Sequence, residues 1–169
     1  MSKNYNVEDK NLQKIFGTYG IFYSIPDYQR PYAWNKDHVE QLWFDIVTAY
    51  LNNKEDSEMD QDYFLGSIVL SKDNINTKNT LSVVDGQQRL TTLTILLCVL
   101  RDIFSEDEIS EVLKIHIIDQ IGKQSKIKLS THDDNQLKFQ KNVIEGINFN
   151  ISVNHTSDNK YLQNALYFY

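Results

Sequence analysis

The stretch VVDGQQRLTT, residues 83–92, joins an apolar run to a glycine-centred turn and then to a long apolar pattern. Strand-forming residues lead into it in TLSVVD (80–85), and apolar side chains follow it at helical spacing from Gln87 to Phe104. Because this helical segment is apolar on nearly every side, we expect it to be the central buried helix. A strand that feeds such a helix predicts a mixed α/β fold, in which a small sheet is packed by helices.

The segments around this junction indicate further helices and strands. Apolar spacing and cap residues predict helices over 6–16, 35–51, 105–120, 133–146 and 159–169, with Asn6, Asn35 and a capping box at Ser105 as starts. Strands are predicted before Pro26, in YFLGSIVLS (63–71) and in KIKLS (126–130), with a bulge or close backbone approach at Gly66. On helix 35–51, the core face is expected to carry Val39, Leu42, Trp43, Ile46, Val47 and Tyr50, and the solvent face Lys36, Asp37, Glu40 and Asp45.

Composition limits the class of protein. The 169 residues are 41% hydrophobic and 24% charged, which suits one globular domain over residues 1–169. No run reaches the roughly 18 to 20 apolar residues of a membrane span, and the N-terminus lacks a signal-peptide core. The single Cys98 excludes a disulfide framework, so we expect a cytoplasmic protein. A net charge of −6 argues against a protein that coats nucleic acid by bulk electrostatics.

The DGQQR turn has the chemistry of a phosphate site. The first turn of a helix offers unpaired N–H groups and partial positive charge, and Gly86 allows close approach to a ligand. Arg89 can hold phosphate oxygens, whereas Asp85 can bind Mg²⁺ or orient a water. The neutral polar side chains that complete this predicted nucleotide and catalytic set are those of Gln87, Gln88, Thr91 and Thr92. An ordinary turn with solvated polar residues is the alternative.

A second polar and aromatic motif is IPDYQRPYAW, residues 25–34. Aromatic faces beside Arg and Gln suit stacking on a nucleobase and hydrogen bonding to its edge. The predicted base-recognition residues are Tyr28, Gln29, Arg30, Tyr32 and Trp34, and Gln29 and Arg30 are also candidates for nucleotide contact. The alternative for Tyr32 and Trp34 is that they pack the loop onto the domain.

Other chemistry finds little support in the chain. Its four histidines show no metal-ligand spacing, and neither a Walker-type loop nor a G-x-G-x-x-G motif occurs. Any use of a nucleotide therefore depends on a different phosphate motif.

With both motifs in view, the chain resembles the N-terminal domain of GmrSD-type, modification-dependent restriction enzymes, whose fold is similar to the ParB and sulfiredoxin group. The matching elements are YSIPDYQRPYAWNKDHVEQLWFDI, YFLGSIVL and VVDGQQRLTTLTILL, which together cover residues 12–104. From residue 105 to 169 the predicted helical part matches loosely.

The resemblance implies a nucleoside-triphosphate-binding, hydrolysing domain that regulates DNA cleavage in phage defence. Nucleoside triphosphate with Mg²⁺ is the implied cofactor. Modified double-stranded DNA and a His-Asn-His type nuclease domain or subunit are the implied partners, and a homodimer is left open. No such nuclease signature occurs here and the chain ends in a helical pattern, so we expect a fragment that does not cut DNA by itself.

Two alternatives stay open. In the first, the domain reads a DNA modification through residues 28–34 without being an enzyme, and DGQQR holds backbone phosphate. In the second, the domain is a docking module for a nuclease, and both motifs are structural.

Overall fold

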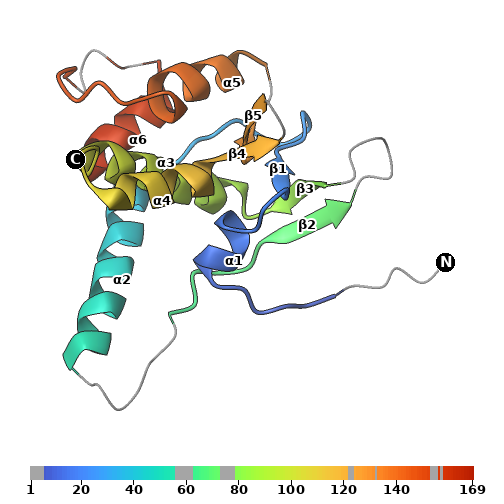
Figure 1. Cartoon of the computed structure of the whole chain (residues 1–169), viewed down its shortest axis with the longest axis horizontal. Coiled ribbons are helices and arrows are strands. Elements are labelled where there is room, and N and C mark those ends of the chain that lie inside the picture. Colours follow the sequence, from blue (N-terminus) through green and yellow to red (C-terminus); the bar gives the residue numbers. More distant parts are fainter. Residues whose placement is uncertain are drawn as a thin grey trace.

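The computed structural model of the chain describes residues 6–55, 63–72, 79–121, 124–131, 133–152, 156 and 158–169. They form a small mixed sheet with helices beside it (Figure 1). The predicted mixed α/β class is confirmed, whereas the finer likeness to ParB and sulfiredoxin stays a prediction. Within the described ranges, no helix combines the length and the apolar character needed to cross a membrane.

The main sheet has the strand order β2–β3–β1–β6. β1 (Phe22–Ser24) is parallel to β3 (Thr80–Asp85) and to β6 (Leu129–Ser130), whereas β2 (Val69–Lys72) is antiparallel to β3. Parallel strands have their carboxyl ends at one edge of a sheet, so the segments that follow β1 and β3 emerge side by side. The sheet topology thereby brings the two polar motifs of the sequence together.

The helices gather around α3, the helix that follows the DGQQR turn. α3 contacts α4, α6 and the π-helix η1, and most of its side chains are buried, as the apolar pattern predicted. Burial of Cys98 inside it raises the pKa of the thiol to about 12, which fits an inert core residue. The bounds are α1 Leu12–Phe16, α2 Lys36–Glu55, α3 Gln87–Ile103, α4 Glu108–Ile117, α5 Asp133–Phe139, η1 Gln140–Ile144 and α6 Lys160–Phe168.

The predicted start of the first helix at Asn6 is wrong. Asn11 caps α1, because its Oδ1 accepts a hydrogen bond of 2.9 Å from Lys14 N. The side chain of Asn6 instead donates to Glu8, and Val7 is 91% exposed, so no core contact supports an earlier turn.

The predicted helix 105–120 is shorter at both ends. Residues 104–107 form a turn, in which Asp107 N donates to Phe104 O, and Asp107 replaces Ser105 as the cap of α4. At the other end, Ile118–Ile121 pair as β4 with β5 (Gln124–Ile127), because two extended antiparallel strands satisfy each other's backbone groups.

Two further boundaries differ from the sequence patterns. β2 starts at Val69 rather than Tyr63, because Gly66 has a φ of 101° that breaks an extended strand. The helix predicted to end at Gly146 changes to π geometry over Gln140–Ile144. Residues 73–78 of the predicted loop KDNINTKN, most of the acidic loop after α2, and two of the histidines lie outside the described residues.

α2 has a core face over only part of its length. Val39 and Leu42 are buried, but Trp43 is 42% exposed and Tyr50 is 58% exposed, contrary to the prediction that both face the core. Tyr50 lies in the second half of α2, which extends away from the other helices (Figure 1). Trp43 contacts the ring of Phe168 edge-on at the end of α6, which is where α2 leaves the body of the domain.

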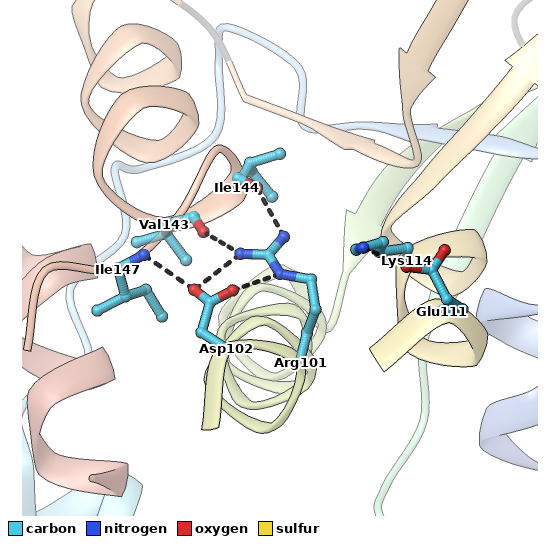
Figure 2. A network of polar contacts seen from close by, with 7 residues as sticks. All are labelled: Arg101, Asp102, Glu111, Lys114, Val143, Ile144 and Ile147. Atoms are coloured by element: carbon cyan, nitrogen blue, oxygen red, sulfur yellow. Dashed lines mark hydrogen bonds and ion pairs between the residues drawn. The ribbon is translucent and has the colours of Figure 1, made fainter. Parts of the chain in front are cut away.

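A buried polar network fastens the C-terminal end of α3 to the residues around η1 (Figure 2). The guanidinium of Arg101 donates to the carbonyls of Ile144 at 2.7 Å and Val143 at 3.2 Å. The adjacent carboxylate of Asp102 pairs with Arg101 and accepts a hydrogen bond from Ile147 N. The network satisfies carbonyls that the end of a helix leaves without intrahelical partners.

Candidate functional site

Gly86 forms the turn between β3 and α3 and is the N-cap of α3. Its φ of 86° lies in the left-handed region that glycine adopts most readily. A Cβ there would lie 2.9 Å from Ser67 O, so the turn is also packed against the chain before β2. Because the cap residue has no side chain, no side-chain hydrogen bond closes the start of α3.

The two glutamines of the motif hold the backbone of the 25–34 segment. Gln88 Oε1 accepts hydrogen bonds from Ala33 N at 2.8 Å and Trp34 N at 3.2 Å, while its amide nitrogen donates to Pro31 O. Gln87 donates to Arg30 O at 2.9 Å. Both side chains are buried, so DGQQR and IPDYQRPYAW form one interlocked unit.

Gln29 reinforces this unit, whereas Tyr28 and Arg30 point outward. The amide of Gln29 donates to Val84 O at 2.8 Å, which ties the segment to the carboxyl end of β3. Tyr28 is 75% exposed, and Arg30 is exposed as well. Two of the predicted recognition residues are therefore displayed on a backbone that internal hydrogen bonds hold in place.

Tyr32 lies inside the domain, as the packing alternative expected. Its hydroxyl is 2.8 Å from Thr92 Oγ1 and accepts a hydrogen bond from Asn164, and its ring stacks on Tyr161. Burial raises the pKa of Tyr32 to about 12, although the hydrogen bonds from Thr92 and Asn164 act against this rise. In this structure Tyr32 and Thr92 join α3 to α6 and do not face solvent.

Besides Asn164 Oδ1, two buried oxygens on α3 have no hydrogen-bond partner among the described residues: Gln87 Oε1 and Thr91 Oγ1. They stand one helical turn apart on α3, so they face the same side. Thr91 is only 1% exposed, which places this predicted nucleotide residue beneath the surface.

Arg89 is half-buried and crosses under the segment that leads into β2. Its Nη1 lies 3.4 Å from Ser67 O, and a Cβ on Gly66 would come within 2.6 Å of its guanidinium. The close approach predicted at Gly66 is thus confirmed, with the Arg89 side chain as the neighbour. Glycine at residue 66 lets the backbone pass directly over the cation.

A pocket of about 210 Å³ opens beside Arg89. Its walls come from the end of the 25–34 segment, from α2, from the chain before β2 and from α3. Trp34 contributes a ring that stacks on His38, with ring centroids 5.6 Å apart. The predicted residues that line it are Trp34 and Arg89, and the other lining residues are His38, Gln41, Leu42, Asp45, Tyr63 and Leu65.

Asp45, expected on the solvent face of α2, is half-buried and lines the pocket, whereas Lys36, Asp37 and Glu40 of that face are exposed as expected. Gln41 donates to Asp45 Oδ1 at 2.8 Å, and a hydrogen bond to Asp45 raises the pKa of Tyr63. Polar residues at 38, 41 and 45 share one helix face, a spacing that was visible in the sequence. Tyr63 gave no such signal, because it reaches the site only through the tertiary structure.

Asp85 ends β3 and is exposed. Among the described residues, no group of three or more His, Cys, Asp or Glu side chains could hold a metal ion. A Mg²⁺ ion at Asp85 would therefore depend on phosphate and water oxygens for its other ligands, which is how Mg²⁺ is usually bound with nucleotides.

Comparison with protein families finds a match to the model described as "GmrSD restriction endonuclease, N-terminal domain", over residues 12–169. The chain belongs to this family. The match extends through α4, α5 and α6, the part that the sequence motifs covered loosely. Membership makes the chain part of a restriction endonuclease system, as the resemblance implied. A comparison with curated proteins finds no match.

Proposed function

We propose that this chain is a nucleoside-triphosphate-binding and hydrolysing domain that regulates DNA cleavage in an anti-phage restriction system. The observation that carries this is the position of Arg89, in the first turn of α3 and in the wall of a pocket shared with the second motif. A helix start without a side-chain cap favours an anion, and a guanidinium provides forked, charged donors for its oxygens.

Each motif residue has a role that fits its surroundings. Arg89 and the backbone near Gly86 hold phosphate, and exposed Asp85 holds Mg²⁺ or orients the attacking water. Gln87 and Gln88 are positioning residues, because their amides are engaged with the 30–34 backbone. Thr91 and Thr92 are buried in α3 and support the same unit by packing inside the domain. Magnesium, when bound, neutralises charge on the phosphates.

The first test is a thermal-shift titration of the full chain with ATP, GTP, CTP and UTP, each with and without Mg²⁺. Ligand at 100 times its Kd stabilises a folded protein by about 2.7 kcal/mol, which raises the melting temperature by several degrees. Arg89→Ala should abolish that rise and remain folded. Lys114→Ala, which removes an exposed cation on α4, is the control and should keep it.

A folded wild-type chain that shows no shift with any of the four nucleotides would refute nucleotide binding. Phosphate release measured on the same samples then tests turnover. Nucleotide binding without phosphate release would support a nucleotide sensor and would contradict the proposed hydrolysis.

The exposure of Tyr28 and Arg30 favours a second candidate, a reader of modified DNA. Their backbone is fixed by three glutamine amides, so their geometry is preorganised for recognition. This function predicts that modified duplex DNA binds without nucleotide and that Tyr28→Ala weakens it about tenfold or more, as loss of one stacked base does. Tyr19→Ala is the matched control, since Tyr19 is 69% exposed at a different place. Equal affinity for modified and unmodified DNA would contradict a reader.

A further inference from the structure

The pocket beside Arg89 contains a negative charge that phosphate binding does not explain. Asp45 lines the same pocket and, among the ion pairs of the described residues, belongs to none. Its Oδ1 accepts a hydrogen bond of 2.8 Å from the Gln41 amide, and its negative charge raises the pKa of the neighbouring Tyr63. A carboxylate accepts about four hydrogen bonds, so it retains acceptor capacity.

The chemistry of Asp45 restricts what it can touch. A carboxylate repels a phosphate unless a metal ion stands between them, but it accepts readily from hydroxyl and N–H donors. A ligand that contacts both Arg89 and Asp45 must therefore carry an anion at one point and donors close by. The two hydroxyls of a ribose that bears phosphates meet this requirement.

The size and walls of the pocket agree with a sugar. Sites that enclose a whole drug-sized ligand measure roughly 300 to 1,000 Å³, so about 210 Å³ holds one part of a nucleotide and leaves the rest outside. The stacked rings of Trp34 and His38 offer an apolar face, against which the C–H face of a sugar can pack. Dinucleotide-binding proteins likewise use a carboxylate for a ribose hydroxyl.

We propose, building on the nucleotide-binding function above, that Asp45 contacts the ribose hydroxyls and makes the site selective for ribonucleotides over nucleotides that lack them. Gln41 is a positioning residue, since its amide donates to the carboxylate, and Tyr63 lines the pocket with it. Such selectivity would keep the domain responsive to the ribonucleotide pool.

The experiment compares ATP, GTP, CTP and UTP with their 2′,3′-dideoxy counterparts by calorimetric titration of the full chain. The wild type should bind the ribonucleotide roughly 10- to 100-fold more tightly, the factor expected for a hydrogen bond to a charged group. Asp45→Asn, which keeps an acceptor for Gln41 and Tyr63, should reduce this preference to a few-fold with little change for the dideoxy form. Asp37→Asn is the matched control, the same change on the same helix outside the pocket, and should keep full preference.

Three outcomes would overturn the assignment. Equal wild-type affinity for both sugars would remove the ribose contact. If Asp45→Asn loses affinity equally for the ribonucleotide and the dideoxynucleotide, and only when Mg²⁺ is present, Asp45 acts through the metal ion instead. If no nucleotide of either kind binds, the nucleotide function itself fails and the ribose contact fails with it, whereas the first two outcomes leave that function standing.

Discussion

Gly66 and Arg89 show how one missing side chain shapes the site. The backbone at Gly66 has a positive φ and passes so close to Arg89 that a methyl group would overlap the guanidinium. Glycine therefore does two separate things at this position, since it allows the turn and it makes room for the cation. The two effects can be separated by experiment because Gly146 has only one of them.

Gly66→Ala should lower the free energy of unfolding by about 1–3 kcal/mol, the cost of a strained backbone, and should also displace Arg89. Gly146→Ala is the control, because its φ of 143° is strained as well but no atom lies within 4 Å of the added Cβ. Urea unfolding should show a loss in both variants, whereas nucleotide titration should show a loss of affinity in Gly66→Ala alone. Equal nucleotide affinities in the two variants would mean that a Cβ at residue 66 does not displace Arg89.

Gln88 is the second position where a single side chain organises the site. Gln88→Ala removes the acceptor for two backbone N–H groups and the donor to Pro31 O, which leaves partly buried groups unsatisfied. We expect a loss of about 2–4 kcal/mol in urea unfolding, from one or two unsatisfied groups. Gln120→Ala removes an exposed amide bonded to Ser125 and should change stability by less than about 0.5 kcal/mol. An unchanged free energy of unfolding in Gln88→Ala would mean that water takes over the hydrogen bonds of the amide.

At the scale of elements, α3 connects the two ends of the domain. Its first turn holds the 25–34 segment, and its last turn holds the residues around η1 through Arg101 (Figure 2). The helix is buried along most of its length, so both attachments are made by a rigid element. Residues 143–147 are therefore fixed by the same helix that carries the DGQQR motif.

Arg101→Met tests the attachment at the end of α3. It leaves two carbonyls and the Asp102 carboxylate without their cationic donor, so we expect a loss of about 3–5 kcal/mol. Lys114→Met breaks an exposed pair with Glu111 on the neighbouring helix and should cost at most about 1 kcal/mol. Urea unfolding measures both, and hydrogen exchange at the Ile147 amide should accelerate only in the Arg101 variant. A slow Ile147 amide in that variant would disprove the coupling.

At the scale of the whole molecule, a buried ion pair joins the β4–β5 hairpin to the N-terminal part of the chain. Lys128 pairs with Asp119 at 2.9 Å, and the side chains are only 1% and 8% exposed. Lys128 also donates to Thr18 O, and Asp119 accepts from Gly20 N. Segments about 100 residues apart in sequence meet at this pair.

Stability should depend on this pair at low pH. Burial acts to raise the pKa of Asp119, but hydrogen bonds from Lys128 and Gly20 outweigh it, so the pKa lies below its ordinary value. A depressed pKa stabilises the fold above the unfolded value of about 3.9, and this contribution is lost as the pH falls from there through the folded value. Asp119→Asn should lower the free energy of unfolding by about 3–5 kcal/mol at pH 7, because it leaves a buried lysine without its carboxylate. Its melting temperature should also fall less steeply than that of the wild type as the pH is lowered. Melting temperatures from pH 7 to pH 2 check this, and parallel acid limbs would contradict it.

Local patterns in the sequence were enough to predict β3, α3, the turn between them and membership of the family. Each depends on neighbours in the chain: alternation or helical spacing of apolar residues, and a glycine where the backbone takes a positive φ. The same reasoning failed at element boundaries that strand pairing decided, as when pairing with β5 ended α4 at Ile117.

The tertiary structure alone decided which polar residues face a ligand and which are internal. Gln88 and Tyr32 find partners 55 and 60 residues away and are buried by them, so residue type could not distinguish them from exposed Tyr28. Asp45, on a face that composition marks as solvent, lines one pocket with Tyr63 and Arg89 only because α2, the chain before β2 and the start of α3 converge there. Hydrophobic periodicity is a local property of the chain, whereas the surroundings of a polar side chain are created by long-range packing.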